Sequence, residues 1–292
     1  MNSKRLSQPW TESSFVALDL ETSGKYPLES DICEIAAIRY ENGKITGEYQ
    51  TLIKPTHKMS DFVITIHGIT NEMVENAPKI EHKIKELHEF IGDSVVTAHH
   101  APFDLGFLAI AFEDARLPLP DGPILCTSLI SRVAFPNSEN HKLQTLIKYL
   151  GIEQGVAHRA LDDTKACLQL LIKCLQELDK KDAKKLQEAG LGPHLTIDKI
   201  RAKQIEELDW KMYSMADLKA NSNLATLVTA IRKHESVQLV YSGGSRPGEA
   251  RNIKPIGIVR NPRGDFLVAM EEGQVEPQPK RYFLQKITRV TI

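Results

Sequence analysis

The sequence predicts a two-domain protein, in which an α/β domain with a mixed sheet is followed by a small β-barrel or sandwich. Its 292 residues exceed the usual length of one domain. In the first part, short apolar runs alternate with helix-like segments. From about Asn221 the chain changes to short strand-like runs separated by turns rich in Gly, Pro and Ser. We expect domains at 1–180 and 221–292, joined by a helical or flexible connector over 181–220.

The first domain is expected to begin with three strands. Phe15–Leu18 is a short apolar run rich in strand formers, and Ile32–Tyr40 and Ile45–Ile53 show a similar composition. Asn42-Gly43, between the latter two, is the pair that a type I′ hairpin turn prefers, because both central positions need a positive φ. The further expected elements are helical segments over 60–91, a buried strand over 94–98, a helix opened by Pro102, a short strand over 123–126, and helices near 140–150 and 160–178.

Composition limits the class of protein. A chain with 41% hydrophobic and 26% charged residues is typical of a globular protein. No apolar stretch approaches the roughly 20 residues that cross a bilayer, and no apolar run typical of a secretory signal follows Met1–Arg5. The cysteines, Cys33, Cys126, Cys167 and Cys174, lack CxxC spacing, which favours buried thiols over a zinc site. We expect a cytoplasmic protein without a membrane partner.

Charge is unevenly distributed between the two halves. Residues 1–180 carry 18 basic and 25 acidic side chains, whereas residues 181–292 carry 19 and 13. An acidic half that gathers carboxylates, joined to a basic half, suits an enzyme that acts on a polyanion. A chance split between two domains is the alternative on charge alone.

Carboxylates occur in three distant segments at positions that favour metal binding. Asp19 and Glu21 end an apolar strand and point to the same face, because side chains two apart in a strand do so. Burying them is costly unless a cation or donors compensate. The alternative for Asp19 and Glu21 is an exposed strand end with ordinary charges. The alternative for Asp104, in the first turn of a helix, is a favourable interaction with the helix dipole. Asp163 shares the apolar face of its helix, so we assign it as a ligand, and we expect Asp162 in a supporting or capping role.

Taken together, these segments resemble the three motifs of the DEDDh 3′→5′ exonucleases, a superfamily that includes the proofreading epsilon subunit of bacterial DNA polymerase III. The resemblance covers residues 14–178 and rests on Asp19-Leu20-Glu21-Thr22-Ser23-Gly24, His67-Gly68-Ile69-Thr70, His99-His100-Ala101-Pro102-Phe103-Asp104, and His158 followed after four residues by Asp163. His100 stands where many members have Asn, which implies altered contacts near the substrate rather than lost chemistry.

The resemblance implies a ribonuclease H-like fold, with a mixed sheet and flanking helices, and two-metal hydrolysis of a phosphodiester. Asp19, Glu21, Asp104 and Asp163 would hold two Mg²⁺ or Mn²⁺ ions, for which carboxylate oxygens are suitable ligands. His158 would take the proton from the attacking water.

The resemblance also implies that Thr22 and His67 contact the terminal nucleotide. A turn residue and a helix cap, respectively, are the alternatives for these two.

The C-terminal domain resembles the WYL domain, a small SH3-like β-barrel associated with binding of nucleic acid or nucleotide ligands. The matching segments are Ala230–Arg232, Val237–Tyr241, Arg251–Pro255, Phe266–Ala269 and Arg281–Ile287. The signature Trp-Tyr-Leu is replaced by Asp265-Phe266-Leu267.

Basic and aromatic residues are interleaved in this domain, a pattern that suits contacts with phosphates and stacking with bases. We expect Arg251 and Arg281 to contact nucleic acid, and Phe266 and Phe283 to lie in the barrel core. The alternative is that the aromatic residues all form the barrel core and the arginines form a solvated rim without a ligand.

The sequence therefore predicts a metal-dependent 3′→5′ exonuclease that releases nucleoside monophosphates, with single-stranded DNA favoured and RNA possible as substrate. The alternative is a regulatory protein that binds nucleic acid or nucleotides and whose nuclease core is inactive. The presence of all four carboxylates and of His158 favours the enzyme.

Overall fold

The structure, a computed structural model, describes residues 6–153, 155, 157–188, 195–204, 206, 208–260, 264–273 and 278–292. The chain divides into two compact units. Unit 1 comprises Met1–Ser23, Ile32–Leu105 and Ala111–Trp210, and unit 2 comprises Gly24–Asp31, Gly106–Ile110 and Lys211–Ile292.

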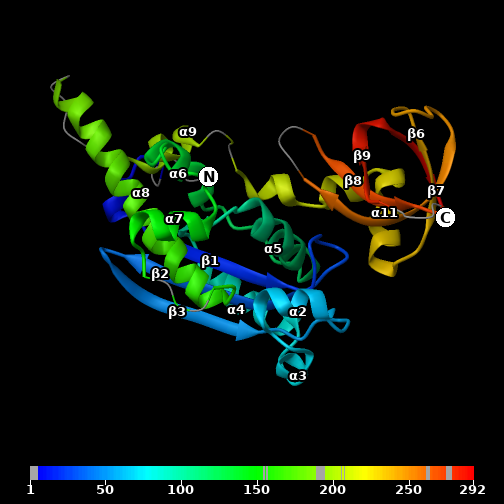
Figure 1. Cartoon of the computed structure of the whole chain (residues 1–292), viewed down its shortest axis with the longest axis horizontal. Helices are drawn as coiled ribbons and strands as arrows, with labels where there is room; N and C mark the ends of the chain where they lie inside the picture. Colours follow the sequence, from blue (N-terminus) through cyan, green and yellow to red (C-terminus); the bar gives the residue numbers. More distant parts are fainter. Residues whose placement is uncertain are drawn as a thin grey trace. The chain divides into compact units, whose positions relative to one another are not determined.

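Unit 1 is built on a five-stranded mixed sheet in the order β3-β2-β1-β4-β5 (Figure 1). Its strands are β1 (Phe15–Thr22), β2 (Ile32–Glu41), β3 (Lys44–Leu52), β4 (Val95–Ala98) and β5 (Ile124–Cys126). The first three strands pair antiparallel, whereas β4 runs parallel to β1 and β5 parallel to β4. The prediction of an α/β sheet of mixed direction is confirmed.

The hairpin between β2 and β3 has the predicted turn. Asn42 and Gly43 adopt φ values of 51° and 80°, both in the left-handed region that a type I′ turn requires. The turn places Glu41 opposite Lys44, so β2 and β3 are paired from their first residues beyond the loop.

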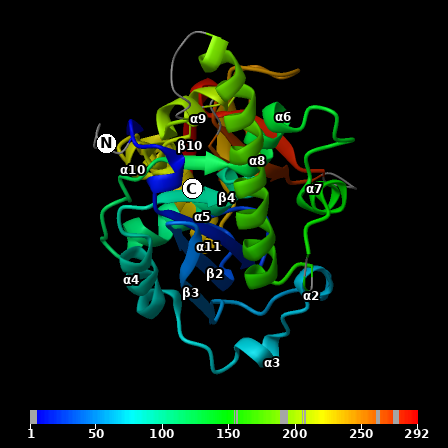
Figure 2. The same ribbon diagram turned by 90° about the vertical axis from the view of Figure 1, so that its left-hand side faces the viewer.

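The helices of unit 1 cover both faces of the sheet. They are α2 (Asp61–His67), α3 (Asn71–Val74), α4 (Ile80–Ile91), α6 (Thr127–Ala134), α7 (Leu143–Leu150), α8 (Ala160–Glu188) and α9 (Ile197–Lys203), together with both ends of α5 (Pro102–Asp114), whose middle residues Gly106–Ile110 count to unit 2. Helix α8 packs on β1 and β2, and α4 approaches β3. Figure 2 shows α8 and α4 on opposite sides of these strands. Pro102 is the first residue of α5, as expected.

Part of the segment expected as a connector belongs to the core of unit 1. Leu195, Ile197 and Ile200 are buried in a cluster with residues of α8. The Gln204 amide oxygen accepts from the Cys126 N–H at 2.6 Å, and its nitrogen donates to the Ile124 carbonyl at 3.2 Å. These contacts satisfy backbone groups of β5, the last strand of the sheet. The segment expected as a connector over 181–220 is thus partly packed within unit 1, and the last division between the units falls after Trp210.

Unit 2 contains a five-stranded antiparallel sheet in the order β10-β6-β7-β8-β9. Its elements are α10 (Ala216–Lys219), α11 (Ser222–Lys233), β6 (Val237–Tyr241), β7 (Ala250–Val259), β8 (Phe266–Glu271), β9 (Lys280–Phe283), a 3₁₀ turn at Leu284–Lys286 and β10 (Ile287–Thr291). The Asn221 side chain caps α11 by accepting from the Asn223 and Leu224 N–H groups. Met215 and Leu218 join the core formed by α11 and the sheet.

The structure bears on membrane-spanning helices and on the state of the cysteines. Among the described residues, no helix is both long and apolar enough to span a bilayer. The four cysteines are free and buried, as expected from their apolar surroundings.

Candidate active site

The acidic residues of β1 face the helix that carries Asp163. Phe15 packs in a cluster with Leu171 of α8, and Ala17 packs with Leu168. Because alternate residues of a strand share a face, the following odd positions, Asp19 and Glu21, also face α8. Their helix partners lie progressively nearer the start of α8. The repulsion of Asp19 by Glu21, and of both by Asp163, fits this common face.

Asp163 enters the site from the first turn of α8. It is buried, with 6% of its surface exposed, whereas its neighbour Asp162 is half-buried. Asp163 lies on the helix face that also buries Cys167, Leu170 and Cys174, which pack against the sheet. The assignment of Asp163 as the inward carboxylate is confirmed.

Asp104 comes from the first turn of α5 and is 2% exposed. Burial raises the pKa of Asp104 well above its ordinary value, and the nearby Glu21 raises it further, against hydrogen bonds from the backbone. The favourable placement near a helix N-terminus is real, but it does not account for a carboxylate buried among others.

The four carboxylates affect one another's protonation. Burial raises the pKa of Asp19 well above its ordinary value, and repulsion from Asp104, Glu21 and Asp163 adds to this effect. Burial, together with Asp163 and Glu34, raises the pKa of Glu21 from 4.5 to about 8, although Arg159 opposes the change. Mutual repulsion requires that these groups lie close together. Residues separated by up to 144 positions in the sequence therefore converge at one point.

His158 completes the cluster. One ligand atom each from Glu21, His158 and Asp163 lies within 4.8 Å of the other two. The His158 N–H donates to Asp163 Oδ2 at 2.9 Å, and the residue adopts a left-handed conformation with φ of 59°. Its side chain is exposed. The structure thus places a solvent-accessible imidazole directly beside two of the predicted metal ligands.

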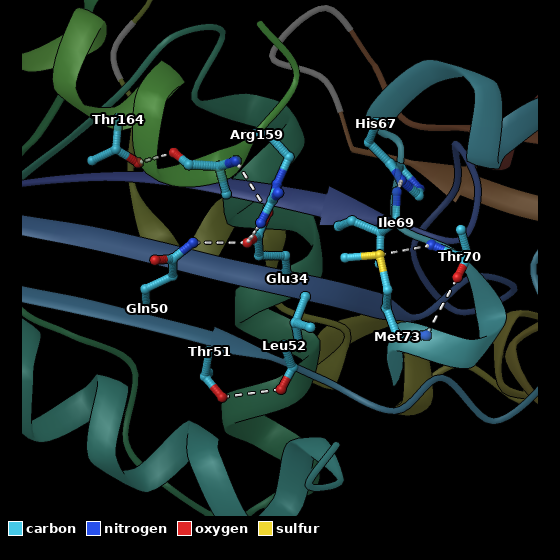
Figure 3. Close-up of polar contacts among 11 residues, drawn as sticks. Glu34, Gln50, Thr51, Leu52, His67, Ile69, Thr70, Met73, Arg159 and Thr164 are labelled. Carbon is cyan, nitrogen blue, oxygen red and sulfur yellow. Dashed lines mark hydrogen bonds and ion pairs between the residues drawn. The ribbon is translucent and has the colours of Figure 1, made fainter. Parts of the chain in front are cut away.

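A fifth carboxylate, Glu34 of β2, was missed by sequence reasoning. Glu34 pairs across from Glu21 in the strand register and is fully buried. Its Oε1 accepts from Arg159 Nη2 at 3.0 Å and from Gln50 Nε2 at 2.9 Å (Figure 3). The Ala160 N–H donates to Oε2 at 3.2 Å. The signal in the sequence was a charged residue inside the apolar run Ile32–Ile38, which must have partners when buried.

Thr22 and His67 lie against each other at the end of β1. Thr22 is 8% exposed and follows a shift of register between Glu21 and Thr22, which turns the end of the strand. His67 is the last residue of α2 and is 3% exposed. Its Nδ1 accepts from the Ile69 N–H at 3.0 Å, so Nε2 carries the proton of the neutral ring (Figure 3). Burial lowers the pKa of His67, against a hydrogen bond to the Thr22 backbone.

His99, from the third matched segment, is bound within unit 1. Its Nδ1 lies 2.9 Å from Thr127 Oγ1, and its Nε2 lies 3.1 Å from the His141 carbonyl oxygen. Burial lowers the pKa of His99 to about 4. The neighbouring His100 adopts a φ of 64°, so the chain turns sharply just before Asp104 and α5.

A family model described as Exonuclease (RNase_T) matches residues 16–171, just over half of the chain. The chain belongs to this exonuclease family. The match spans every residue of the cluster, from Asp19 in β1 to Asp163 in α8. Members of the family generally use divalent metal ions, which fits a site made of carboxylates.

Curated relatives of the exonuclease domain are much longer than this chain. The DNA polymerase III PolC-type of Bacillus cereus is 34% identical over 170 residues, which cover 58% of this chain and 12% of that protein. The PolC-type polymerase of Bacillus subtilis is 34% identical over 171 residues, with the same coverage of 58% and 12%. The chain therefore spans only about an eighth of the length of these relatives.

Solved structures share the fold. The nuclease domain of 3′hExo, a DEDDh family member bound to rAMP, is 19% identical over 58% of this chain and 95% of that one, with a TM-score of 0.50. E. coli exonuclease I in complex with a dT13 oligonucleotide is 16% identical over 89% of this chain and 55% of that one, with a TM-score of 0.51. These likenesses support the ribonuclease H-like α/β fold of unit 1.

In unit 2, Arg251 does not lie where the sequence suggested. It is 8% exposed, with its guanidinium 5.8 Å from the Tyr241 ring centroid and 5.9 Å from that of Tyr282. Arg251 Nη1 lies 4.0 Å from Glu271 Oε1. Arg251 therefore uses its charge and its planar face inside the unit, and its contact with nucleic acid stays a prediction.

Arg281 is exposed, as its predicted role requires, and lies 5.0 Å from the Phe266 ring centroid. Phe283 is 41% exposed and packs edge-on against the half-buried Phe266 at 6.4 Å. The expectation that both phenylalanines lie in the core is wrong. Tyr282 is the residue of β9 that points inward, so its neighbours Arg281 and Phe283 must point outward.

Proposed function

We propose that this chain is a 3′→5′ exonuclease of the DEDDh type, which hydrolyses phosphodiester bonds at a 3′ end and releases nucleoside monophosphates. The observation that carries the proposal is the convergence of Asp19, Glu21, Asp104 and Asp163 beside the exposed imidazole of His158. Membership of the exonuclease family supports the reaction class. A regulatory protein with an inactive nuclease core is the less favoured alternative, because no member of this set is missing.

We propose that the site holds two divalent cations, Mg²⁺ or Mn²⁺. Asp19, Glu21 and Asp104 have raised pKa values, and Asp163 adds to the repulsion on the first two, so a hard cation would stabilise the ionised carboxylates. Glu21 and Asp163 already offer oxygens within 4.8 Å of each other. When bound, two such ions would activate a water molecule and stabilise the leaving 3′-oxygen.

His158 acts as the general base in this proposal. Its imidazole is exposed and lies beside Glu21 and Asp163, where a water molecule bound by these ligands would be within reach. The imidazole would accept the proton that the water loses as it attacks phosphorus. Thr22 and His67 would hold the terminal nucleotide. Because His67 is held as a neutral tautomer, it carries no positive charge that would compete with a metal ion for the carboxylates.

We propose single-stranded DNA as the preferred substrate, with RNA as a further substrate. The similarity to the PolC-type polymerases supports DNA. The whole function of those longer polymerases is not transferred to this chain.

For unit 2 we propose an SH3-like, WYL-like barrel that adds affinity for single-stranded nucleic acid. The support is a face of β8 and β9 on which Phe283 and Phe266 are accompanied by two cations. Arg281 lies over Phe266 at 5.0 Å, and Lys286 Nζ lies 5.9 Å from the Phe283 ring centroid. Exposed rings beside positive charge suit base stacking with phosphate contact.

The experiment for the nuclease uses DNA and RNA oligomers labelled at either end, incubated with Mg²⁺, Mn²⁺ or EDTA. Shortening from the 3′ end that requires a divalent ion is the expected result, with mononucleotides as the product. A preparation of Asp163→Asn, purified identically, controls for contaminating nuclease. Activity that persists in EDTA, or in this variant, contradicts the proposal.

The experiment for unit 2 uses Phe283→Ala in the full chain and measures binding of a labelled oligo(dT) at several salt concentrations. Loss of one stacked base is expected to weaken binding by about 1–3 kcal/mol. Arg281→Ala is expected to reduce the salt dependence by about one unit of slope. Exposed Tyr149 of α7, which is outside unit 2, supplies a matched control as Tyr149→Ala. Unchanged affinity and slope in the first two variants refute this role.

A further inference from the structure

The carboxylate of Glu34 is buried and fully hydrogen-bonded, so it is not available to contact a substrate. Its carboxylate is 0% exposed and accepts four hydrogen bonds from three residues (Figure 3). Oε1 accepts from Arg159 Nη2 at 3.0 Å and from Gln50 at 2.9 Å, and Oε2 accepts from the Ala160 N–H at 3.2 Å and from Arg159 Nε at 3.4 Å. A two-pronged contact between guanidinium and carboxylate fixes the orientation of both groups. Glu34 is therefore a rigid point on β2.

The residues that Glu34 holds flank His158. Arg159 follows His158 directly, and Ala160 is the first residue of α8. His158 adopts a φ of 59°, a left-handed conformation that costs a residue other than glycine about 1–3 kcal/mol and persists only where neighbours enforce it. On one side the His158 N–H is bonded to Asp163 Oδ2. On the other side, Arg159 and Ala160 are bonded to Glu34.

We propose that Glu34, acting through Arg159, is a positioning residue that holds the turn carrying His158 so that the imidazole stays beside Glu21 and Asp163. The inference rests on the proposed function. Glu34 is suited to this role by its register, because it pairs directly with Glu21. Glu34 on β2 therefore lies beside Glu21 on β1, one of the proposed metal ligands. The hydrogen bonds of Glu34 with Arg159 and Ala160 are called the clamp.

Attachment of α8 to the sheet does not depend on this clamp. Leu168 of α8 packs with Ala17 and Ile38 of the sheet, and Thr164 Oγ1 lies 3.5 Å from the Ala36 carbonyl oxygen. Buried ion pairs add little net stability, since the loss of hydration offsets their attraction. Glu34 thus serves local geometry rather than anchorage of the helix.

The first test compares Glu34→Gln with the unaltered full chain, in steady-state kinetics on a labelled single-stranded oligomer. Glutamine has nearly the same volume, but it replaces a charged acceptor with an amide group that donates toward Arg159 and Ala160. We expect kcat to fall about 10- to 100-fold, with KM within about threefold, because substrate contacts are untouched. The matched control is Glu48→Gln on β3, where the carboxylate is about half exposed and 3.9 Å from Lys165; it is expected to retain the original kcat.

A double-mutant cycle separates positioning from a general structural effect. If Glu34 acts through His158, then Glu34→Gln changes kcat by less than about threefold in a His158→Ala background. The same 10- to 100-fold loss in that background overturns the proposal. Mn²⁺ affinity, measured by calorimetry without substrate, is expected to change by less than about threefold. A larger loss of affinity assigns Glu34 to the metal ligands and also overturns it.

Arg159→Lys provides a second route if Glu34→Gln does not fold. Lysine keeps the charge and loses the two-pronged contact, and the Arg159 side chain is 36% exposed, so this change is tolerated more easily. We expect the same fall in kcat, again absent from the His158→Ala background. Failure of the two hypotheses is distinguishable: an unaltered chain without nuclease activity refutes the proposed function. An active chain whose Arg159→Lys and Glu34→Gln variants keep the original kcat refutes only the positioning role.

Discussion

Each unit of this protein buries acidic side chains, and the two do so with opposite outcomes. In unit 2, Glu271 is 6% exposed. Its carboxylate accepts hydrogen bonds from Lys280 Nζ at 2.7 Å, the Tyr282 hydroxyl at 2.8 Å and Arg246 Nη2 at 3.2 Å. Burial alone would raise the pKa of Glu271, yet the hydrogen bonds from Lys280 and Tyr282 lower it. In unit 1, the pKa values of Asp19, Glu21 and Asp104 are raised.

The difference distinguishes a carboxylate that stabilises the fold from carboxylates that can bind a ligand. The protein itself neutralises Glu271, so this carboxylate needs no ligand. The acidic cluster of unit 1 contains more negative charge than its neighbours balance, and Arg159, the cation beside it, is bonded to Glu34. A site in this state favours binding of a cation from solution. This contrast predicts different responses of the two units to substitution, metal and pH.

Removal of a cluster carboxylate is expected to have the largest effect. Asp19→Ala or Asp163→Asn removes a proposed metal ligand, and the several kcal/mol of stabilisation that the ions give the transition state correspond to a loss of at least about 10⁴-fold in kcat. The variants are expected to unfold at or above the temperature of the unaltered metal-free protein, because repulsion in the cluster is relieved. Single-turnover assays and calorimetry measure the two quantities. Near-normal turnover in both variants would sink the metal site.

Loss of the imidazole is expected to have a smaller effect. His158→Ala should lower kcat by about 10²–10⁴-fold, the usual contribution of a general base. Mn²⁺ affinity should stay near normal if His158 acts as a base, since the carboxylates remain. The rate profile over pH 5–9 should lose its dependence on a group that must be deprotonated. An unchanged profile argues against this role, and a large loss of affinity shows that His158 is instead a ligand, as its proximity to Glu21 and Asp163 would also allow.

The structural glutamate of unit 2 gives the opposite result. Glu271→Gln leaves the buried Arg251 without its counter-charge, and we expect unit 2 to lose about 3–5 kcal/mol of stability. The pKa of Glu271 is lowered in the folded protein, so its contribution to stability is present above its ordinary pKa and disappears as pH falls. Hydrogen exchange of the amides of β6–β9 measures the loss. Turnover of a short oligomer should be retained, and a fall as large as that of Asp163→Asn would remove the distinction between the two units.

The smallest expected effect is a pH dependence of stability without metal. Glu21 has a pKa of about 8 in the folded protein against an ordinary value of 4.5, so between these values the folded state binds more protons than the unfolded state. The free energy of unfolding therefore falls as pH rises through this window. In EDTA we expect Tm to be lower at pH 8.5 than at pH 5.5 by at least about 2–4 °C.

Mg²⁺ is expected to restore more of this stability at pH 8.5 than at pH 5.5, because it binds the ionised carboxylates. Glu21→Gln serves as the control, since it removes the titrating group and should flatten the dependence. Calorimetric scans at both pH values measure these differences. A metal-free Tm that rises over the same window contradicts the arrangement of charges described for the cluster.

Much of the fold of unit 1 followed from local patterns. The strand formers of β1 to β3, the Asn42-Gly43 turn and the proline that opens α5 each act over a few residues, so they can be recognised without the rest of the chain. Helix α6 was not expected, because its eight residues include Thr127, Ser128 and Ser131, small polar residues that favour no regular element by themselves. Its packing against α8 decides its conformation.

Local spacing along the chain was enough to predict which carboxylates of β1 and α8 face the site. The two-residue period of β1 aligns Asp19 with Glu21, and the helical period of α8 turns Asp163 inward, because side-chain direction follows from local backbone geometry. Three features could be seen only once the chain was folded: Glu34 holds Arg159 across 125 positions of the chain, Arg251 is buried while Phe283 is exposed, and Gln204 binds backbone groups of β5. These outcomes depend on strand register and on packing between distant segments, which local spacing does not specify.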